Sequence, residues 1–308
     1  MYTDNSGKRY NSYSQYLKDI FGEKVYKVTL NANLGCPNRD GTKSFGGCIF
    51  CDDDGSFSKA HDGLLPIKDQ LAEGINNLET RFNAHRFIAY LQSYSNTYAD
   101  VRKLKQIYDD ATDNERVVGL SIGTRPDCVD EEKISLIQSY TNNKEVWIEY
   151  GLQSIKDKTL ELINRSHTAK DFLDAVKLSQ NRGIKISAHV ILGLPGETKE
   201  DMLDTARALA DTGIDGVKLH ALCVLKNSKL EKLYNSGELK ILDEDEYVDL
   251  ACSFMELLPE NVVIHRLAGN GYKKSLLAPV WLGQKFKTLN KIDEWFEKNN
   301  SWQGKNSK

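Results

Sequence analysis

The chain has 308 residues, of which 40% are hydrophobic and 28% charged, a composition typical of a globular protein with a buried core. It contains no long uncharged apolar run and starts without an apolar leader, so we expect no membrane-spanning segment and a cytoplasmic protein. The formal net charge of −3 excludes overall basicity as an argument for nucleic-acid binding, and six cysteines are too few for a disulfide scaffold.

Short β-branched runs alternate with helical stretches over residues 25–222. The predicted strands are Val25–Asn31, Phe87–Gln92, Val117–Gly123, Val146–Leu152, Ile184–Leu192 and Ile214–Leu222. Apolar residues between them recur every three or four positions, as the buried face of a helix requires. Six such units with right-handed crossovers predict an α/β fold, a partial TIM-type (βα)6 barrel with its chemistry at the carboxyl ends of the strands.

The segments on either side of this core are less regular. Residues 1–24 predict an N-terminal arm with one helix, Tyr13–Phe21. Residues 223–308 predict a C-terminal α/β extension packed on the core. Its expected elements are two helices, a strand and a closing helix, near Lys229–Tyr234, Glu244–Leu258, Val262–Arg266 and Lys291–Lys298.

One loop after the first strand carries three cysteines, Cys36, Cys48 and Cys51, with the spacing C-x11-C-x2-C. The close pair suits a tetrahedral zinc ion or neighbouring irons of a cluster. A closed zinc site needs a fourth ligand, whereas three cysteines on a four-iron cluster leave one iron open for another ligand. These three residues, called the loop cysteines below, therefore predict a metal centre with an open position.

Several sequence words around this loop stand in a recognisable order. CPNRDG, GGCIFC, GLSIGTRPD, EYGLQS and VILGLPGET together resemble the radical S-adenosylmethionine (SAM) superfamily, and within it the YhcC-type family related to the catalytic subunit of elongator. The resemblance covers roughly residues 8–290. The commonest superfamily spacing is C-x3-C-x2-C, so the long first gap is a departure that fits the YhcC-type branch. The resemblance implies a [4Fe-4S] cluster on the loop cysteines and SAM as second cofactor.

The resemblance also implies which residues hold SAM. Gln153 would bind the ribose, and Arg165 would pair with the methionyl carboxylate through its planar guanidinium. Phe50 would pack against the adenine, unless it is a simple loop-packing residue. The remaining expected SAM contacts are Gln92, Ser93, Leu192 and Gly193.

Glu149 precedes Gln153 on the same predicted strand. Side chains along a strand point alternately to its two faces, and Glu149 and Gln153 are an even number of positions apart. Their side chains therefore point to the same face. An inward carboxylate at a strand end suits the ribose hydroxyls. The alternative is an ion pair with Arg125 or Lys185.

Other polar residues near the strand ends are candidates for substrate contact. Histidines in this set are equally explained as hydrogen-bonded structural groups. The set comprises Tyr94, Asn96, Arg125, Asp127, His167, His189 and His220.

The resemblance implies reductive cleavage of SAM and hydrogen abstraction from a substrate held in the barrel. Gram-positive YhcC-type proteins resemble enzymes that modify the tRNA wobble uridine, converting a 5-carboxymethylaminomethyl side chain to the aminomethyl form. The expected partners are tRNA and an electron donor such as flavodoxin or ferredoxin. The alternatives are the same chemistry on a small metabolite or peptide, and a non-catalytic metal-binding or redox-sensing module.

Overall fold

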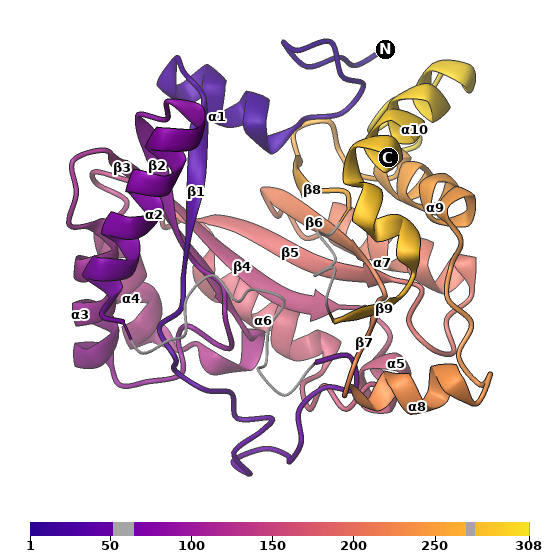
Figure 1. Ribbon diagram of the computed structural model, residues 1–308, viewed down its shortest axis with the longest axis horizontal. Helices are drawn as coiled ribbons and strands as arrows, with labels where there is room; N and C mark the ends of the chain where they lie inside the picture. Colours follow the sequence, from indigo (N-terminus) through magenta and orange to yellow (C-terminus); the bar gives the residue numbers. More distant parts are fainter. Residues whose placement is uncertain (52–64, 269–274, 308) are drawn as a thin grey trace.

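A seven-stranded parallel sheet forms the centre of the computed structural model, which describes residues 1–51, 65–268 and 275–307. The strand order is β1-β2-β3-β4-β5-β6-β8, and every neighbouring pair is parallel. The sheet curls into a half-barrel with β1 and β8 at its two edges (Figure 1). Its strands are β1 Val25–Leu30, β2 Arg86–Leu91, β3 Val117–Thr124, β4 Glu145–Gln153, β5 Lys185–Leu192, β6 Gly216–Ala221 and β8 Val263–Arg266.

Helices connect the strands and pack on the outer face of the sheet (Figure 1). The connecting helices are α2 Ile67–Phe82, α3 Val101–Thr112, α4 Glu131–Ser139, α5 Asp157–Leu162, α6 Ala169–Ser179 and α7 Lys199–Ala210, with a 3-10 turn η1 at Pro126–Cys128. Several of these helices begin at a side-chain cap. At α7, for example, Thr198 and Asp201 form a reciprocal capping box, which satisfies backbone N–H groups that the first turn leaves unpaired.

The two faces of the sheet have different environments. Outward side chains such as Leu120, Ile148 and Val190 are fully buried in the main apolar core under the helices. At the amino end of the strands, a smaller cluster of Tyr13, Leu17, Trp147 and Val263 closes the inside of the half-barrel against α1 Tyr13–Phe21. The opposite, carboxyl end remains for the site.

The C-terminal segment contains α8 Lys229–Asn235, α9 Glu244–Glu256, the 3-10 turn η2 Val280–Gln284 and α10 Lys285–Lys298. A short antiparallel pair, β7 Val224–Leu225 and β9 Leu276–Ala278, lies beside them. The sequence did not predict this pair.

The α/β half-barrel and its six strand-helix units are confirmed, with strand ends within about two residues of the prediction. Helix Tyr13–Phe21 has the predicted bounds, whereas the last helix begins at Lys285 instead of Lys291. The strand expected in the extension, β8, pairs with β6 and becomes the seventh strand of the barrel sheet. In the described residues, no helix combines the length and apolar character needed to cross a membrane.

Candidate functional site

The loop cysteines meet at the carboxyl end of the half-barrel. Cys36, Cys48 and Cys51 all line one cavity of about 150 Å3, called the cysteine cavity below. The loop that carries them follows β1 and lies at the end of the barrel opposite α1 (Figure 1). Parallel strands end on the same side, so residues after several strands share this cavity.

Hydrogen bonds tie the cysteine loop to the segment after α5. The Asn38 side chain donates to the carbonyl of Asn164 at 2.5 Å and to Cys48 Sγ at 3.4 Å. In return, the Asn164 side chain donates to the carbonyl of Gly47 at 2.8 Å. The loop and the residue next to Asn164, Arg165, therefore keep a fixed relation to each other.

Arg165 uses all three of its guanidinium nitrogens. Nη1 donates to Cys48 Sγ at 3.4 Å, Nη2 donates to the carbonyl of Gly151 at 2.8 Å, and Nε donates to His167 Nε2 at 2.9 Å. A Cβ atom at position 151 would lie 2.5 Å from Arg165 Nη2, so only glycine allows this approach. The arrangement brings a positive charge against a cysteine sulfur.

This charge changes the chemistry of the thiol. A hydrogen bond from Cys51, with the charges of Arg165 and Arg125, holds the pKa of Cys48 well below its usual range. The thiolate is the form of cysteine that ligates metals. Cys48 is therefore prepared as a ligand.

The donor set fits an iron–sulfur cluster better than a single ion. Among the residues that the structure describes, no three His, Cys, Asp or Glu side chains converge as ligands of one metal ion. The thiolates of a cluster do not have to converge on one point, because each thiolate binds its own iron. Three thiols around one cavity suit such a cluster, and Arg125 and Arg165 line the same cavity as counter-charges.

The cavity also gathers many of the predicted cofactor and substrate residues. They come from the cysteine loop, from β2, β3, β4 and β5 or the residues just after them, and from the segment after α5. The predicted residues that line it are Phe50, Gln92, Tyr94, Arg125, Glu149, Gln153, Arg165 and His189. Sequence reasoning missed Arg39 and Thr124, which line it as well.

Gln153 has an unusual backbone at this point. Its φ of 75° is rare for a residue other than glycine, and it follows an irregularity in the β4–β5 pairing. Only 8% of the residue is exposed. Such strained positions concentrate at functional sites, which agrees with the predicted role of Gln153 in the cofactor site.

Three candidates do not line the cavity but form hydrogen bonds with residues that do. The Asp127 carboxylate holds the Arg125 guanidinium with two bonds of 2.8 Å. His167 accepts from Arg165, and burial with the charges of Arg165 and Arg125 lowers the pKa of His167 to about 3, so it stays neutral. The Asn96 amide donates to the carbonyls of Leu91 and Gly123 and joins β2 to β3.

The remaining candidates are not among the residues that line the cysteine cavity. Ser93 is buried, and the His220 ring lies 5.4 Å from the ring of His189 on the neighbouring strand. Leu192 on β5 does not line this cavity either. It faces the helix-covered core, while Ile191 packs in the cluster that contains Phe50, because adjacent strand residues point to opposite faces.

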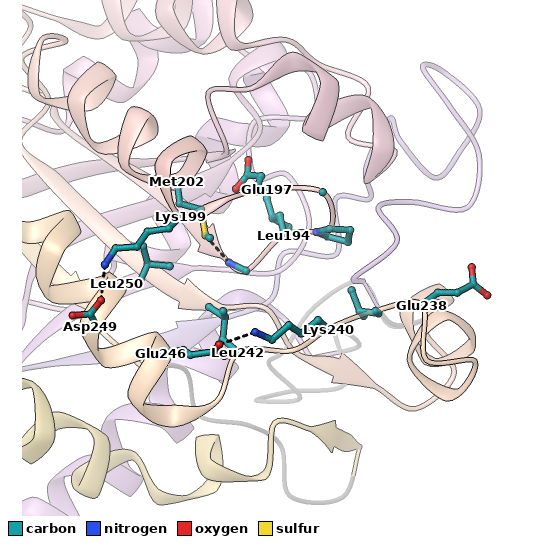
Figure 2. A pocket seen from close by; sticks show the side chains of 14 residues that line it. Leu194, Glu197, Lys199, Met202, Glu238, Lys240, Leu242, Glu246, Asp249 and Leu250 are labelled. Carbon is teal, nitrogen blue, oxygen red and sulfur yellow. Dashed lines mark hydrogen bonds and ion pairs between the residues drawn. The ribbon is translucent and has the colours of Figure 1, made fainter.

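Gly193 lies in a different cavity, of about 500 Å3, between the β5–α7 turn and the segment that joins α8 to α9 (Figure 2). Its backbone N–H is 3.0 Å from Met202 Sδ. Two ion pairs, Lys199–Asp249 at 2.5 Å and Lys240–Glu246 at 2.6 Å, border this cavity. Gly193 is therefore not among the residues that line the cysteine cavity, and its contact with SAM stays a prediction.

Glu149 has partners that the sequence did not suggest. Its carboxylate accepts from Lys27 at 2.8 Å, Lys218 at 2.8 Å and His189 at 2.7 Å. The predicted alternatives have other partners, since Arg125 pairs with Asp127 and Lys185 with Asp215. Glu149 is thus the centre of an ion network and not a free acceptor. The sequence did offer one signal of this network, since Lys27 and Lys218 each stand inside a largely apolar strand.

Family models match most of the chain. The radical SAM superfamily model matches residues 32–209, and the radical SAM C-terminal domain model matches residues 214–298. The chain is 36% identical to protein YhcC of Escherichia coli over 94% of this chain and 92% of that protein.

Two further similarities are to a tRNA uridine(34) acetyltransferase and to the structure of Elp3. A tRNA uridine(34) acetyltransferase of Methanocaldococcus infernus is 29% identical over 51% of this chain and 29% of that protein. The structure of M. infernus Elp3, with its N-terminus deleted, superposes with a TM-score of 0.67 at 19% identity, covering 91% of this chain and 64% of the other. The latter shows a shared fold. From the matched models, the YhcC similarity and the cavity of three cysteines, the chain belongs to the radical SAM enzymes, in their YhcC-type family.

Proposed function

We propose that this enzyme binds a [4Fe-4S] cluster through Cys36, Cys48 and Cys51, binds SAM beside it, and modifies the wobble uridine of tRNA. The modification is the conversion of a 5-carboxymethylaminomethyl side chain to the aminomethyl form. Loss of a hydrogen atom and one further electron from the methylene beside the carboxylate would give an imine, which water would hydrolyse to the amine and glyoxylate, with SAM as the two-electron oxidant. The observation that carries the chemistry is the single cavity shared by the loop cysteines, Arg165 and Gln153. The similarity to a tRNA uridine(34) acetyltransferase over half of the chain supports the substrate class.

When bound, the reduced cluster and SAM supply the radical chemistry that abstracts hydrogen. The chain's own residues bind and orient. Arg165 would hold the methionyl carboxylate and Gln153 the ribose, while Phe50 and Ile191 provide apolar contact for the adenine. Asp127 keeps Arg125 directed at the cavity.

A surface at the start of α10 supports tRNA as partner. Phe286 is 80% exposed between Lys285 and Lys287. With Arg81 and Phe82 at the end of α2, these residues line a cavity of about 580 Å3. Exposed aromatic side chains beside basic ones suit RNA, because bases stack on the rings and phosphates pair with the cations.

We propose the following division of the chain. Residues 25–222 form the catalytic core, residues 1–24 an N-terminal arm, and residues 223–308 an extension that packs on the core. An electron donor such as flavodoxin or ferredoxin would reduce the cluster in the cytoplasm.

The deciding experiment is mass spectrometry of tRNA nucleosides from cells with and without the gene. Deletion is expected to accumulate 5-carboxymethylaminomethyl-uridine and to lose the aminomethyl form. The wild-type gene and a Cys252→Ala variant, whose cysteine lies buried on α9, should both restore the profile, whereas Cys48→Ala should not. An unchanged profile on deletion would contradict the tRNA substrate and favour a small metabolite or peptide.

A further inference from the structure

The inside of the half-barrel carries more positive than negative charge. Lys27 on β1, Lys218 on β6 and Arg266 on β8, called the barrel cations below, come from both edges of the sheet and face one carboxylate, Glu149 on β4. Three basic side chains around one carboxylate are more than the pairing of that carboxylate requires. A structural ion pair needs only one cation, so this excess needs another explanation.

Arg266 reaches this face because of an irregularity in the sheet. The pairing of β6 with β8 shifts between Val217 and Lys218, so that Lys218 and Arg266 are directly opposite each other. Residues opposite each other on neighbouring strands point to the same face. Among the described residues, the side chain of Arg266 has no ion pair or hydrogen bond, so its guanidinium can donate to a ligand.

The burial of Lys218 makes the positive charge around it unfavourable. Its side chain is only 4% exposed, and it donates to Glu149 at 2.8 Å and to the Tyr90 hydroxyl at 2.6 Å. Burial lowers the pKa of Lys218 to about 7, and the charges of Arg266 and Lys27 add to this effect against the opposing effect of Glu149. An added anion would relieve this repulsion.

A second polar group in the same region also lacks a partner. Nε2 of His220 is buried and makes no hydrogen bond within the described part of the chain. Its ring lies beside that of His189, which lines the cysteine cavity. Buried polar atoms in folded proteins are normally paired, so an unpaired one indicates a missing partner.

The barrel cations adjoin the reaction cavity. Glu149, to which Lys27 and Lys218 are bonded, lines the same cavity as Cys48 and Cys51. His189 joins the two regions, since it bonds to Glu149 and lines the cavity. A substrate group that extended from the cysteine cavity past Glu149 would therefore reach the barrel cations.

We infer that Lys27, Lys218 and Arg266 form a binding site for a carboxylate group of the substrate, inside the barrel and next to the cysteine cavity. This inference rests on the proposed function, in which the uridine side chain ends in a carboxylate. The planar guanidinium of Arg266 can donate two parallel hydrogen bonds to a carboxylate, and Lys218 can supply a third donor. The backbone phosphate of the RNA is the other anion that could enter, and the test separates the two.

The test measures RNA affinity for the cluster-loaded enzyme. Three anticodon stem–loop RNAs are compared, which carry 5-carboxymethylaminomethyl-uridine, its methyl ester, or 5-aminomethyl-uridine. We expect the wild type to bind the acid about tenfold more tightly than the other two. Arg266→Gln and Lys218→Met should bind all three with equal affinity. The control Lys185→Met, which removes a lysine paired with Asp215 away from the site, should keep the preference.

The loss of Lys218 removes a partner of Glu149, so folding is checked by thermal unfolding. Arg266→Gln removes no side-chain hydrogen bond or ion pair among the described residues and is therefore the variant that is expected to fold. Retention of the preference by folded Arg266→Gln and Lys218→Met, or equal binding of acid and ester by the wild type, would overturn the inference. The latter result is also the one expected if a phosphate occupies the site.

A second readout separates this inference from the tRNA proposal. Sodium acetate should raise the melting temperature of the wild type above that in sodium chloride of equal ionic strength, and should not do so in Arg266→Gln. If no RNA binds but acetate has this effect, the carboxylate site stands and the tRNA substrate is wrong. If acetate has no effect on the wild type and the three RNAs bind equally, the barrel cations are a structural network only.

Discussion

Arg165 donates a hydrogen bond to Sγ of Cys48 across 3.4 Å, although 117 residues separate them in the chain. One guanidinium thus contacts a predicted cluster ligand and lies in the cavity where the SAM carboxylate is expected. The same side chain is fixed by Gly151 and His167, so it has little freedom to turn away. The proposed cluster ligation and the proposed SAM binding would therefore both depend on this one positioned residue.

Replacing any one of the loop cysteines by alanine is expected to remove the cluster, because two thiolates do not hold it. Iron and sulfide per chain should fall to near zero, and 5′-deoxyadenosine formation from SAM should stop. Cys252→Ala is the matched control, since its thiol lies on α9 in the apolar core, where it donates to the carbonyl of Ile292. Undiminished 5′-deoxyadenosine after Cys36→Ala, Cys48→Ala or Cys51→Ala would refute the ligand assignment.

Arg165→Lys should weaken SAM binding about tenfold while retaining the positive charge, because lysine lacks the planar fork that serves a carboxylate and two fixed acceptors. Equilibrium dialysis of SAM with the cluster-loaded protein measures this affinity. Arg182→Lys, at a residue that pairs with Glu131 on the outer helices, should leave the affinity unchanged. Equal affinities for the Arg165 variant and the wild type would show that this arginine does not bind SAM.

The lowered pKa of Asp127 predicts that the free energy of unfolding depends on pH in the acid range. Burial raises its pKa, but the hydrogen bonds and charge of Arg125 outweigh burial and lower the pKa of Asp127 to about 2. A lowered pKa in the folded state means that the stabilisation is complete above pH 4 and is lost as the pH falls toward 2. The loss is about 2 kcal/mol. Urea unfolding of wild type and Asp127→Asn should differ above pH 4 and converge near pH 2, whereas a constant difference would contradict the assignment.

Gly119 on β3 should not tolerate a side chain. A Cβ atom there would lie 2.5 Å from the backbone carbonyl oxygen of Glu145 and 2.5 Å from Ile88 Cδ1. Gly119→Ala is therefore expected to reduce the free energy of unfolding by about 1–3 kcal/mol. Gly283→Ala provides the control, because no heavy atom of the described residues, its chain neighbours aside, lies within 4 Å of its added Cβ. Equal denaturant midpoints for the two variants would contradict the close strand contact.

Much of the fold could be predicted because its signals are local. The alternation of apolar runs located the six strands of the βα units, and helix Tyr13–Phe21 had the predicted bounds. The last strand was found as an element but assigned to a separate extension, since no periodicity states which strand it pairs with. The face to which Leu192 points could not be predicted for a similar reason. A continuously apolar strand shows no alternation, so only its packing reveals that Ile191 faces the Phe50 cluster.

The sequence by itself determined the loop cysteines, their spacing and the family, because these depend on neighbouring residues. The tertiary structure alone decided which distant side chains meet. Glu149 bonds to Lys27 and Lys218, which are 122 and 69 residues away, and Arg266 joins them through a shift in strand pairing. Strand register and the curl of the sheet set these contacts, and both arise from the packing of the whole chain, which short-range patterns do not record.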